Sequence, residues 1–233
     1  MVKESIHQEF GRFLREEMDD NINENSNLAI KIENLKFKYD DQIVFDNQNF
    51  TINRGQKLLI HGPSGCGKTT LINLMSGLLQ SQFGKIIFEN EDLFELSENQ
   101  LDKLRAKNFG FVFQRLYLIN YLNVEQNIQL ANISSNSSNM NSLIEELGLL
   151  DKRKSKIREL SVGEAQRVAI ARAIVSKPKV IFADEPTSAL DDNNSEKVMK
   201  LLFAQAEKNN TTLIVSSHDS RIKKKFSNFL ELD

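Results

Sequence analysis

The chain has 233 residues, with 30 Lys and Arg side chains against 32 Asp and Glu, and 40% of its residues are hydrophobic. This length suits one large α/β domain with a built-in subdomain, and it is sufficient to bury a sizeable core. The near balance of charge argues against a nucleic-acid partner and against direct binding to an anionic membrane surface.

The composition also indicates the compartment. Cys66 is the single cysteine, which excludes a disulfide framework within the chain and favours a reducing compartment. No apolar run reaches the ~18 residues of a membrane-spanning helix. The N-terminal sequence MVKESIHQEF lacks the apolar core of a signal peptide. We therefore expect a cytoplasmic protein that meets a membrane only through a partner.

Residues 1–27 form an N-terminal extension whose first part is amphipathic. Its apolar side chains fall near helical spacing, at Ile6, Phe10, Phe13, Leu14 and Met18. The polar, Asn-rich tract 19–27 is expected to be a linker. The short helix covers the domain's own surface or docks onto a partner, and the pattern leaves both interpretations open.

The remaining chain, residues 28–233, alternates between strand-like and helix-like segments. Strands are expected over 28–33, 49–52, 57–61, 85–89, 109–113, 179–183 and 212–216. Helices are expected after the loop that follows 57–61, over 97–107, through most of 120–160, and over 163–176 and 194–208, with a low-complexity loop at 132–142. This order predicts an α/β fold with a mainly parallel core sheet and an antiparallel β element near its start.

A glycine-rich loop follows the strand 57–61 and opens a helix. It reads Gly62-Pro63-Ser64-Gly65-Cys66-Gly67-Lys68-Thr69 and matches the pattern G-x-x-x-x-G-K-S/T. The glycines let successive backbone N–H groups converge on phosphate oxygens, and the helix adds its positive end. Lys68 is expected to reach the β- and γ-phosphates, and the Thr69 hydroxyl to ligate Mg²⁺. The predicted nucleotide contacts extend to Thr70.

Two carboxylates end the apolar strand 179–183, in the run Val180-Ile-Phe-Ala-Asp184-Glu185. An acidic residue at the end of a buried strand beside a phosphate loop supplies the anionic partner that Mg²⁺ needs. Asp184 fits that role. Glu185 is then placed to orient and polarise the attacking water.

The stretch Leu160-Ser-Val-Gly-Glu-Ala-Gln-Arg-Val-Ala-Ile-Ala-Arg-Ala173 resembles the signature of ABC ATP-binding cassettes, commonly L-S-G-G-Q followed by a basic helix. Other landmarks of that family follow in the expected order across residues 28–233. The resemblance implies that Tyr39 stacks on adenine and that Gln114 is the glutamine that contacts the metal and the nucleotide. It also implies that Asp191 belongs to a loop at the dimer interface and that His218 bonds the γ-phosphate.

The signature departs from the common pattern at two positions. Val162 replaces one glycine of the pair and Glu164 replaces the glutamine, whereas Ser161 and Gly163 are retained. The resemblance implies that these four residues contact the γ-phosphate bound by the opposite subunit. ATP is then enclosed only between two cassettes that meet head to tail. A homodimer is the simple expectation, and a heterodimer with a different cassette stays open.

Residues 105–127 and 183–191 resemble the group that contains lipoprotein-releasing, macrolide-exporting and cell-division ATPases. The resemblance implies integral membrane permease-type partners and a place on the cytoplasmic face of the inner membrane. It also implies a helical signature subdomain at about 115–170. Apolar side chains after Gln114 would contact a coupling helix of the partner or fill the subdomain core, and both interpretations stay open; they are Leu116, Tyr117, Leu118, Ile119, Tyr121 and Leu122.

The sequence therefore predicts a P-loop ATPase of the ABC type that uses ATP and Mg²⁺, with Glu185 and His218 as catalytic residues. Three functions compete. We favour the motor subunit of an export, lipoprotein-release or mechanotransmission complex. A regulatory ATPase of cell division or envelope remodelling, without net transport, differs only in its membrane partner. A soluble ABC protein of translation or repair is disfavoured, because those proteins usually carry a second cassette or a long coiled-coil insertion.

Overall fold

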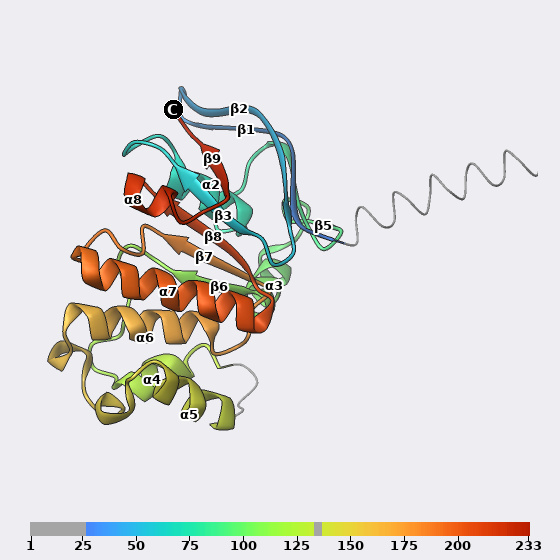
Figure 1. The fold of residues 1–233 in the computed structure, drawn as a ribbon. Helices are drawn as coiled ribbons and strands as arrows, with labels where there is room; N and C mark the ends of the chain where they lie inside the picture. The colour runs from blue at the N-terminus through green and yellow to red at the C-terminus, as the bar shows by residue number, and fades with distance from the viewer. Residues whose placement is uncertain (1–26, 133–136) are drawn as a thin grey trace, which may run out of the picture.

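The computed structural model describes residues 27–132 and 137–233 (Figure 1). The amphipathic helix predicted near the N-terminus and nearly all of its linker lie outside the described residues. No helix in the described part of the chain is both long and apolar enough to cross a bilayer.

A five-stranded parallel sheet forms the centre of the fold, in the order β6-β7-β8-β3-β9. Its strands are β3 Lys57–His61, β6 Phe109–Val112, β7 Val180–Asp184, β8 Thr212–Ser217 and β9 Asn228–Glu231. The three central strands β7, β8 and β3 are short and rich in buried Ile, Val and Leu, as expected for strands covered on both faces. The predicted mainly parallel sheet is confirmed.

Side chains alternate along these strands into two separate cores. Leu59, Ile181 and Leu213 join the core on the side of α6 and α7. Leu58 and Phe182 point to the other side, where α2 and the antiparallel sheet cover them. Figure 1 shows this layering, with α6 and α7 on one face of the sheet and α2 on the other. The alternation follows from the two-residue period of a strand.

The second sheet is antiparallel, in the order β2-β1-β4-β5. Its strands are β1 Leu28–Tyr39, β2 Gln42–Asn53, β4 Phe83–Phe88 and β5 Glu91–Asp92. The first two strands are longer than predicted, and each continues through an asparagine with a positive φ angle, 50° at Asn34 and 61° at Asn47. The pairing of β1 with β2 shifts register near Asn34, so the polar alternation breaks there while the strand continues.

The helices occupy the predicted regions with revised ends. They are α2 Lys68–Met75, α3 Glu98–Asn108, α4 Val124–Gln129, α5 Ser137–Glu146, α6 Val162–Ile174, α7 Asp192–Asn209 and α8 Ser220–Lys223, with the 3₁₀ turns η1 Leu150–Lys152 and η2 Ile157–Glu159. The loop predicted for 132–142 is too long, because α5 begins at Ser137. Its Met140, Leu143 and Ile144 are buried in the core, and this packing outweighs the weak helix propensity of Ser and Asn.

Candidate functional site

The predicted chemistry lies at one edge of the parallel sheet. The glycine-rich loop follows β3, the acidic pair ends β7, His218 follows β8, and Gln114 comes two residues after β6. All four strands run in parallel, so their carboxyl ends meet at the same edge. Ligands of open parallel sheets bind at this edge.

The glycine-rich loop bends sharply into α2. Gly65 and Gly67 have φ angles of 87° and 101°, in the left-handed region that glycine adopts without steric cost. Gly67 precedes α2, so the positive end of this helix faces the loop. Lys68 is only 6% exposed, and its ammonium donates hydrogen bonds of 2.9 Å to the Gly62 carbonyl and 2.8 Å to the Pro63 carbonyl. The loop therefore presents N–H groups and one held cation, as phosphate binding requires.

The backbone at Leu232 passes so close to residue 62 that only glycine, which has no Cβ atom, fits there. A Cβ atom at this position would lie 2.2 Å from the Leu232 carbonyl oxygen and 2.7 Å from the Cys66 sulfur. We expect Gly62→Ala to lower the free energy of unfolding by about 3 kcal/mol, since a backbone oxygen cannot move aside easily. Gly65→Ala is the matched control: it has open space and only a positive φ, so its cost should be about 1 kcal/mol. Denaturant unfolding of both variants tests this, and equal losses would contradict it.

Asp184 lies between two hydroxyl groups. Its Oδ2 accepts a hydrogen bond of 2.8 Å from the Thr69 hydroxyl, and its Oδ1 accepts one from Ser216 on β8. Thr69 is the second residue of α2, so this bond ties the phosphate loop to the end of β7. The predicted metal-binding pair Thr69 and Asp184 is thus brought together in the structure.

These oxygens fit Mg²⁺, which prefers hard oxygen ligands and keeps several positions for water and phosphate. Within residues 27–132 and 137–233, no group of three His, Cys, Asp or Glu side chains gathers into a metal cage. One carboxylate and one hydroxyl beside a phosphate loop are the arrangement expected for an ion that arrives with a nucleotide.

Ser216 is a site residue that the sequence analysis missed. Its hydroxyl donates to Asp184 and accepts a hydrogen bond of 3.0 Å from the backbone N–H of Glu185. Glu185 has a φ of 47°, a backbone conformation that a non-glycine residue adopts only when its surroundings hold it. The available signal was a polar side chain in the buried apolar run Thr212–Ser217, directly before His218.

We expect Ser216→Ala to lower kcat for ATP hydrolysis about tenfold, because Asp184 Oδ1 loses its hydrogen-bond donor while the Glu185 N–H keeps only the Ser216 carbonyl. The free energy of unfolding should fall by about 1–3 kcal/mol, the usual cost of a buried polar group left unpaired. Thr211→Ala is the control, since Thr211 is equally buried but donates to the Pro178 carbonyl, away from the acidic pair. Steady-state ATPase assays should show that only Ser216→Ala slows turnover, and a normal kcat would contradict this role.

Glu185 lies at the centre of the site. Its Oε1 lies 2.8 Å from His218 Nδ1 and 3.7 Å from the Lys68 ammonium. The Glu185 side chain is 10% exposed, whereas that of His218 is 56% exposed. A buried carboxylate is thus held between a cation and a histidine that reaches solvent. A cleft of about 380 Å³ opens beside them, lined also by Thr187, Ser188 and Arg221.

Tyr39 lies at the end of β1, next to the phosphate loop. Its hydroxyl is 3.4 Å from the Thr70 hydroxyl, and its ring packs edge-on against Phe37 with the ring centroids 4.9 Å apart. Half of Tyr39 is exposed. The structure therefore brings an exposed aromatic ring and the Thr70 side chain to the same side of the loop. Ser64 is exposed and Cys66 is half-buried in the loop itself.

The four signature residues lie at the start of α6, and no hydrogen bond or ion pair of the described residues joins them to the phosphate loop. Ser161 caps the helix: its hydroxyl accepts from the Glu164 N–H, and the Glu164 carboxylate accepts from the Ser161 N–H at 2.7 Å. The Ser161 N–H and hydroxyl both donate to the Glu164 carboxylate, and these two bonds lower the pKa of Glu164. Glu164 thus completes a capping box, which explains an acid at this position. Val162 is 58% exposed on the same helix end.

Asp191 and Gln114 occupy the loops on either side of this site. Asp191 caps α7 by accepting hydrogen bonds from the backbone and side chain of Asn194, which lower the pKa of Asp191. Gln114 is exposed beyond β6, the neighbour of β7. Both residues are exposed, whereas Asp184 and Glu185 are buried.

A phosphate loop beside a strand that ends in two carboxylates defines a nucleoside-triphosphate-binding domain of the P-loop class. The ABC transporter family profile matches residues 45–188, more than half of the chain, so the protein belongs to the ABC transporter family. The predicted ABC-type ATPase fold and ATP binding are confirmed on this basis.

Curated relatives point to the same group. The lipoprotein-releasing system ATP-binding protein LolD of Treponema denticola is 37% identical over 186 residues, which cover 77% of this chain and 82% of that protein. The putative hemin import ATP-binding protein HrtA of Staphylococcus haemolyticus is 36% identical over 187 residues, which cover 77% of this chain and 83% of that protein. The macrolide export ATP-binding/permease protein MacB of Aggregatibacter actinomycetemcomitans is 36% identical over 81% of this chain, but over only 30% of its own length.

Solved structures agree with the fold. The ATP-binding cassette MJ0796, a dimer in a post-hydrolysis state bound to ADP and Pi, superposes with a TM-score of 0.78 at 31% identity, covering 88% of this chain and 94% of its own. The cassette cbiO1 of Clostridium perfringens, part of the transporter complex cbiONQ, gives a TM-score of 0.81 at 28% identity, covering 89% and 85%.

Proposed function

We propose that this ABC-type ATPase is the motor subunit of a membrane complex for export, lipoprotein release or mechanotransmission, and that it acts at the cytoplasmic face of the membrane. The observation that carries the proposal is Glu185, held between the Lys68 ammonium and His218 at the end of β7. The names of the relatives support the class of complex, since lipoprotein release and macrolide export both occur among them.

The reaction is ATP + water to ADP + phosphate. The N–H groups of residues 62–69 and the Lys68 ammonium bind the β- and γ-phosphates. Glu185 orients and polarises the attacking water, and His218 donates a hydrogen bond to the γ-phosphate. Thr69, Asp184 and Gln114 would hold Mg²⁺, which supplies positive charge to the phosphate oxygens when it is bound.

The second half of the site comes from another cassette. Ser161 and Gly163 lie at the N-terminus of α6, where backbone N–H groups and the helix dipole attract an anion. Among the described residues, no hydrogen bond or ion pair joins this helix end to the phosphate loop of its own chain. We therefore infer a head-to-tail dimer in which Ser161, Val162, Gly163 and Glu164 face the ATP of the partner cassette, with Asp191 at the interface. The dimeric relative MJ0796 supports this arrangement.

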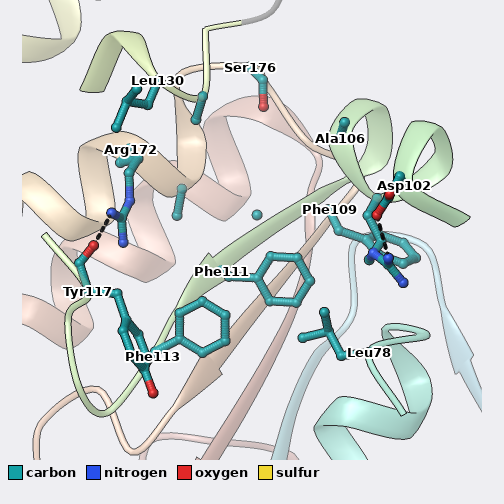
Figure 2. A pocket seen from close by; sticks show the side chains of 14 residues that line it. Leu78, Asp102, Ala106, Phe109, Phe111, Phe113, Tyr117, Leu130, Arg172 and Ser176 are labelled. Atoms are coloured by element: carbon teal, nitrogen blue, oxygen red, sulfur yellow. Dashed lines mark hydrogen bonds and ion pairs between the residues drawn. The ribbon is translucent and has the colours of Figure 1, made fainter. Parts of the chain in front are cut away.

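Residues 115–170 are proposed as the subdomain that transmits this closure to permease-type partners, and residues 28–233 as one ATP-binding domain. A groove between α3, β6 and α6 is the proposed partner contact (Figure 2). Tyr117 and Tyr121 are 62% and 75% exposed, which suits contact with a partner, whereas Leu118 packs against the core. We therefore propose Tyr117 and Tyr121 for the partner contact and Leu118 for the subdomain core.

The test is a detergent pull-down from native membranes with the Glu185→Gln variant, ATP and Mg²⁺, followed by mass spectrometry. The proposal expects a membrane subunit with few spans and a large extracytoplasmic domain. Cargo transport by the reconstituted complex would support the motor function. ATP-driven remodelling without cargo movement would support the regulatory function in cell division or envelope remodelling. Recovery of soluble proteins alone would contradict membrane coupling.

A further inference from the structure

The groove proposed above as the partner contact has a volume of about 510 Å³ and is walled by α3 on one side and α6 on the other. In Figure 2 its floor is the strand β6, which carries Phe111, with Phe113 just beyond its end. These two rings stack with centroids 5.3 Å apart and an interplanar angle of 1°. Tyr117 meets Phe113 edge-on at 5.5 Å, so the three rings form one apolar surface.

The rim adds apolar side chains that face solvent. Leu78 is 46% exposed and Leu130 is 58% exposed, and both line the groove. Leucine side chains left exposed around an aromatic floor mark a surface that gains free energy when another apolar group covers it. The groove therefore suits a protein segment that inserts an aromatic or aliphatic anchor.

Two guanidinium groups line the same groove, and they differ in their partners. Arg105 on α3 pairs with Asp102 at 2.6 Å and also lies 3.9 Å from the Glu98 carboxylate. Arg172 on α6 donates to two backbone carbonyls, 2.6 Å to Leu116 and 2.7 Å to Tyr117. Across residues 27–132 and 137–233, no carboxylate forms an ion pair with Arg172. Figure 2 shows its side chain reaching toward Tyr117 along the groove wall.

Arg172 therefore carries a positive charge that no carboxylate of the described residues pairs with. The side chain is half-buried, and burial lowers the pKa of its guanidinium below the usual value. The guanidinium has five N–H donors and stays charged in proteins, so two carbonyl bonds leave donors unused. A carboxylate at this position would form a charge-assisted bidentate contact and offset the cost of burying the charge.

We infer that the groove accepts a segment of the membrane partner that carries an apolar or aromatic anchor beside an Asp or Glu, with its carboxylate on Arg172. This inference rests on the proposed function, since it specifies the partner of the same complex. The aromatic floor binds the anchor, and the unpaired guanidinium selects the acid. Arg105 does not serve this purpose, because Asp102 already neutralises it.

The first experiment locates the segment. The full chain carries the photo-crosslinker p-benzoylphenylalanine in place of Leu130, and the complex in native membranes is irradiated and analysed by mass spectrometry. The same probe in place of Leu150 is the control, because Leu150 is 54% exposed but does not line the groove. We expect a crosslink from position 130 alone, to a membrane-protein segment with an Asp or Glu within a few residues of an apolar side chain.

The second experiment measures the contact itself by a double-mutant cycle on the purified complex. Arg172→Gln and the change of the crosslinked Asp or Glu to its amide should each weaken association at least tenfold, and together no more than either alone. Arg172→Lys should retain part of the affinity through its charge. A merely structural role for Arg172, in holding the carbonyls of Leu116 and Tyr117, would weaken association additively with the partner's change. Thermal unfolding of each variant identifies losses that arise from misfolding.

The outcomes separate the two proposals. The inference is overturned if the crosslinked segment of the membrane subunit contains no Asp or Glu, or if the double-mutant cycle gives additive effects. The proposed function stays intact in both cases. A crosslink to a soluble protein or to a second copy of the chain overturns both. A crosslink of equal yield from position 150, or none from position 130, overturns the groove as the contact surface.

Discussion

Glu185→Gln should reduce kcat for ATP hydrolysis about 10²–10⁴-fold, the contribution expected of a positioned general base. The amide keeps the size and hydrogen-bonding reach of the carboxylate but cannot take up a proton from the attacking water. The negative charge 3.7 Å from the Lys68 ammonium also disappears, so ATP binding should persist or tighten. The variant should therefore accumulate as an ATP-bound dimer. Phosphate-release kinetics and size-exclusion chromatography with ATP and Mg²⁺ measure the two effects.

Glu207→Gln is the matched control for this substitution. Glu207 also accepts from a lysine, Lys57, but it is exposed and lies at the opposite end of β3 from the phosphate loop. The kcat of the Glu207→Gln variant should stay within about twofold of that of the unmodified chain, because exposed ion pairs contribute little to stability. If Glu185→Gln hydrolyses ATP at the rate of this control, another group orients the water. If it stops turnover without any ATP-dependent dimer, the proposed sandwich is wrong.

The parts of the site that could be predicted from the sequence are those encoded by contiguous residues. The loop 62–69 specifies its own geometry, since glycines at fixed spacing permit the positive φ angles that the structure shows at Gly65 and Gly67. The acidic pair could be predicted equally well, because an apolar run that ends in Asp184 and Glu185 indicates both a buried strand and a pair of carboxylates at its end. In each case neighbouring residues carry all of the information.

What the sequence did not predict depends on contacts between distant residues. Ser216 matters because β8 pairs with β7 in a register that places Asp184 opposite Ser216. The strand β9 has no buried apolar run of its own, and it forms by parallel pairing with β3. Arg172 lies in a helix that the sequence located correctly, but its bonds to the carbonyls of Leu116 and Tyr117, and not to a carboxylate of the described residues, follow only from the packing of α6 beside the segment after β6. Side-chain partners of this kind follow from tertiary packing, which periodicity alone does not encode.

Lys68→Ala should weaken ATP binding at least a hundredfold, because it removes the one buried cation of the phosphate loop. Charge-assisted hydrogen bonds contribute about 1.5–3 kcal/mol each, and the ammonium is expected to contact both the β- and γ-phosphates. Lys57→Ala is the control, since Lys57 lies on the same strand–loop unit but its ammonium contacts Glu207 and the Phe203 ring, away from the phosphate loop. This variant should keep its ATP affinity within about twofold. Isothermal titration with ATP, with thermal unfolding of both variants in parallel, separates lost binding from lost folding. Tight ATP binding by a folded Lys68→Ala variant would contradict the assignment of the phosphate loop as the nucleotide site. It would also contradict the role of Glu185, because that role rests on the position of its carboxylate 3.7 Å from the Lys68 ammonium.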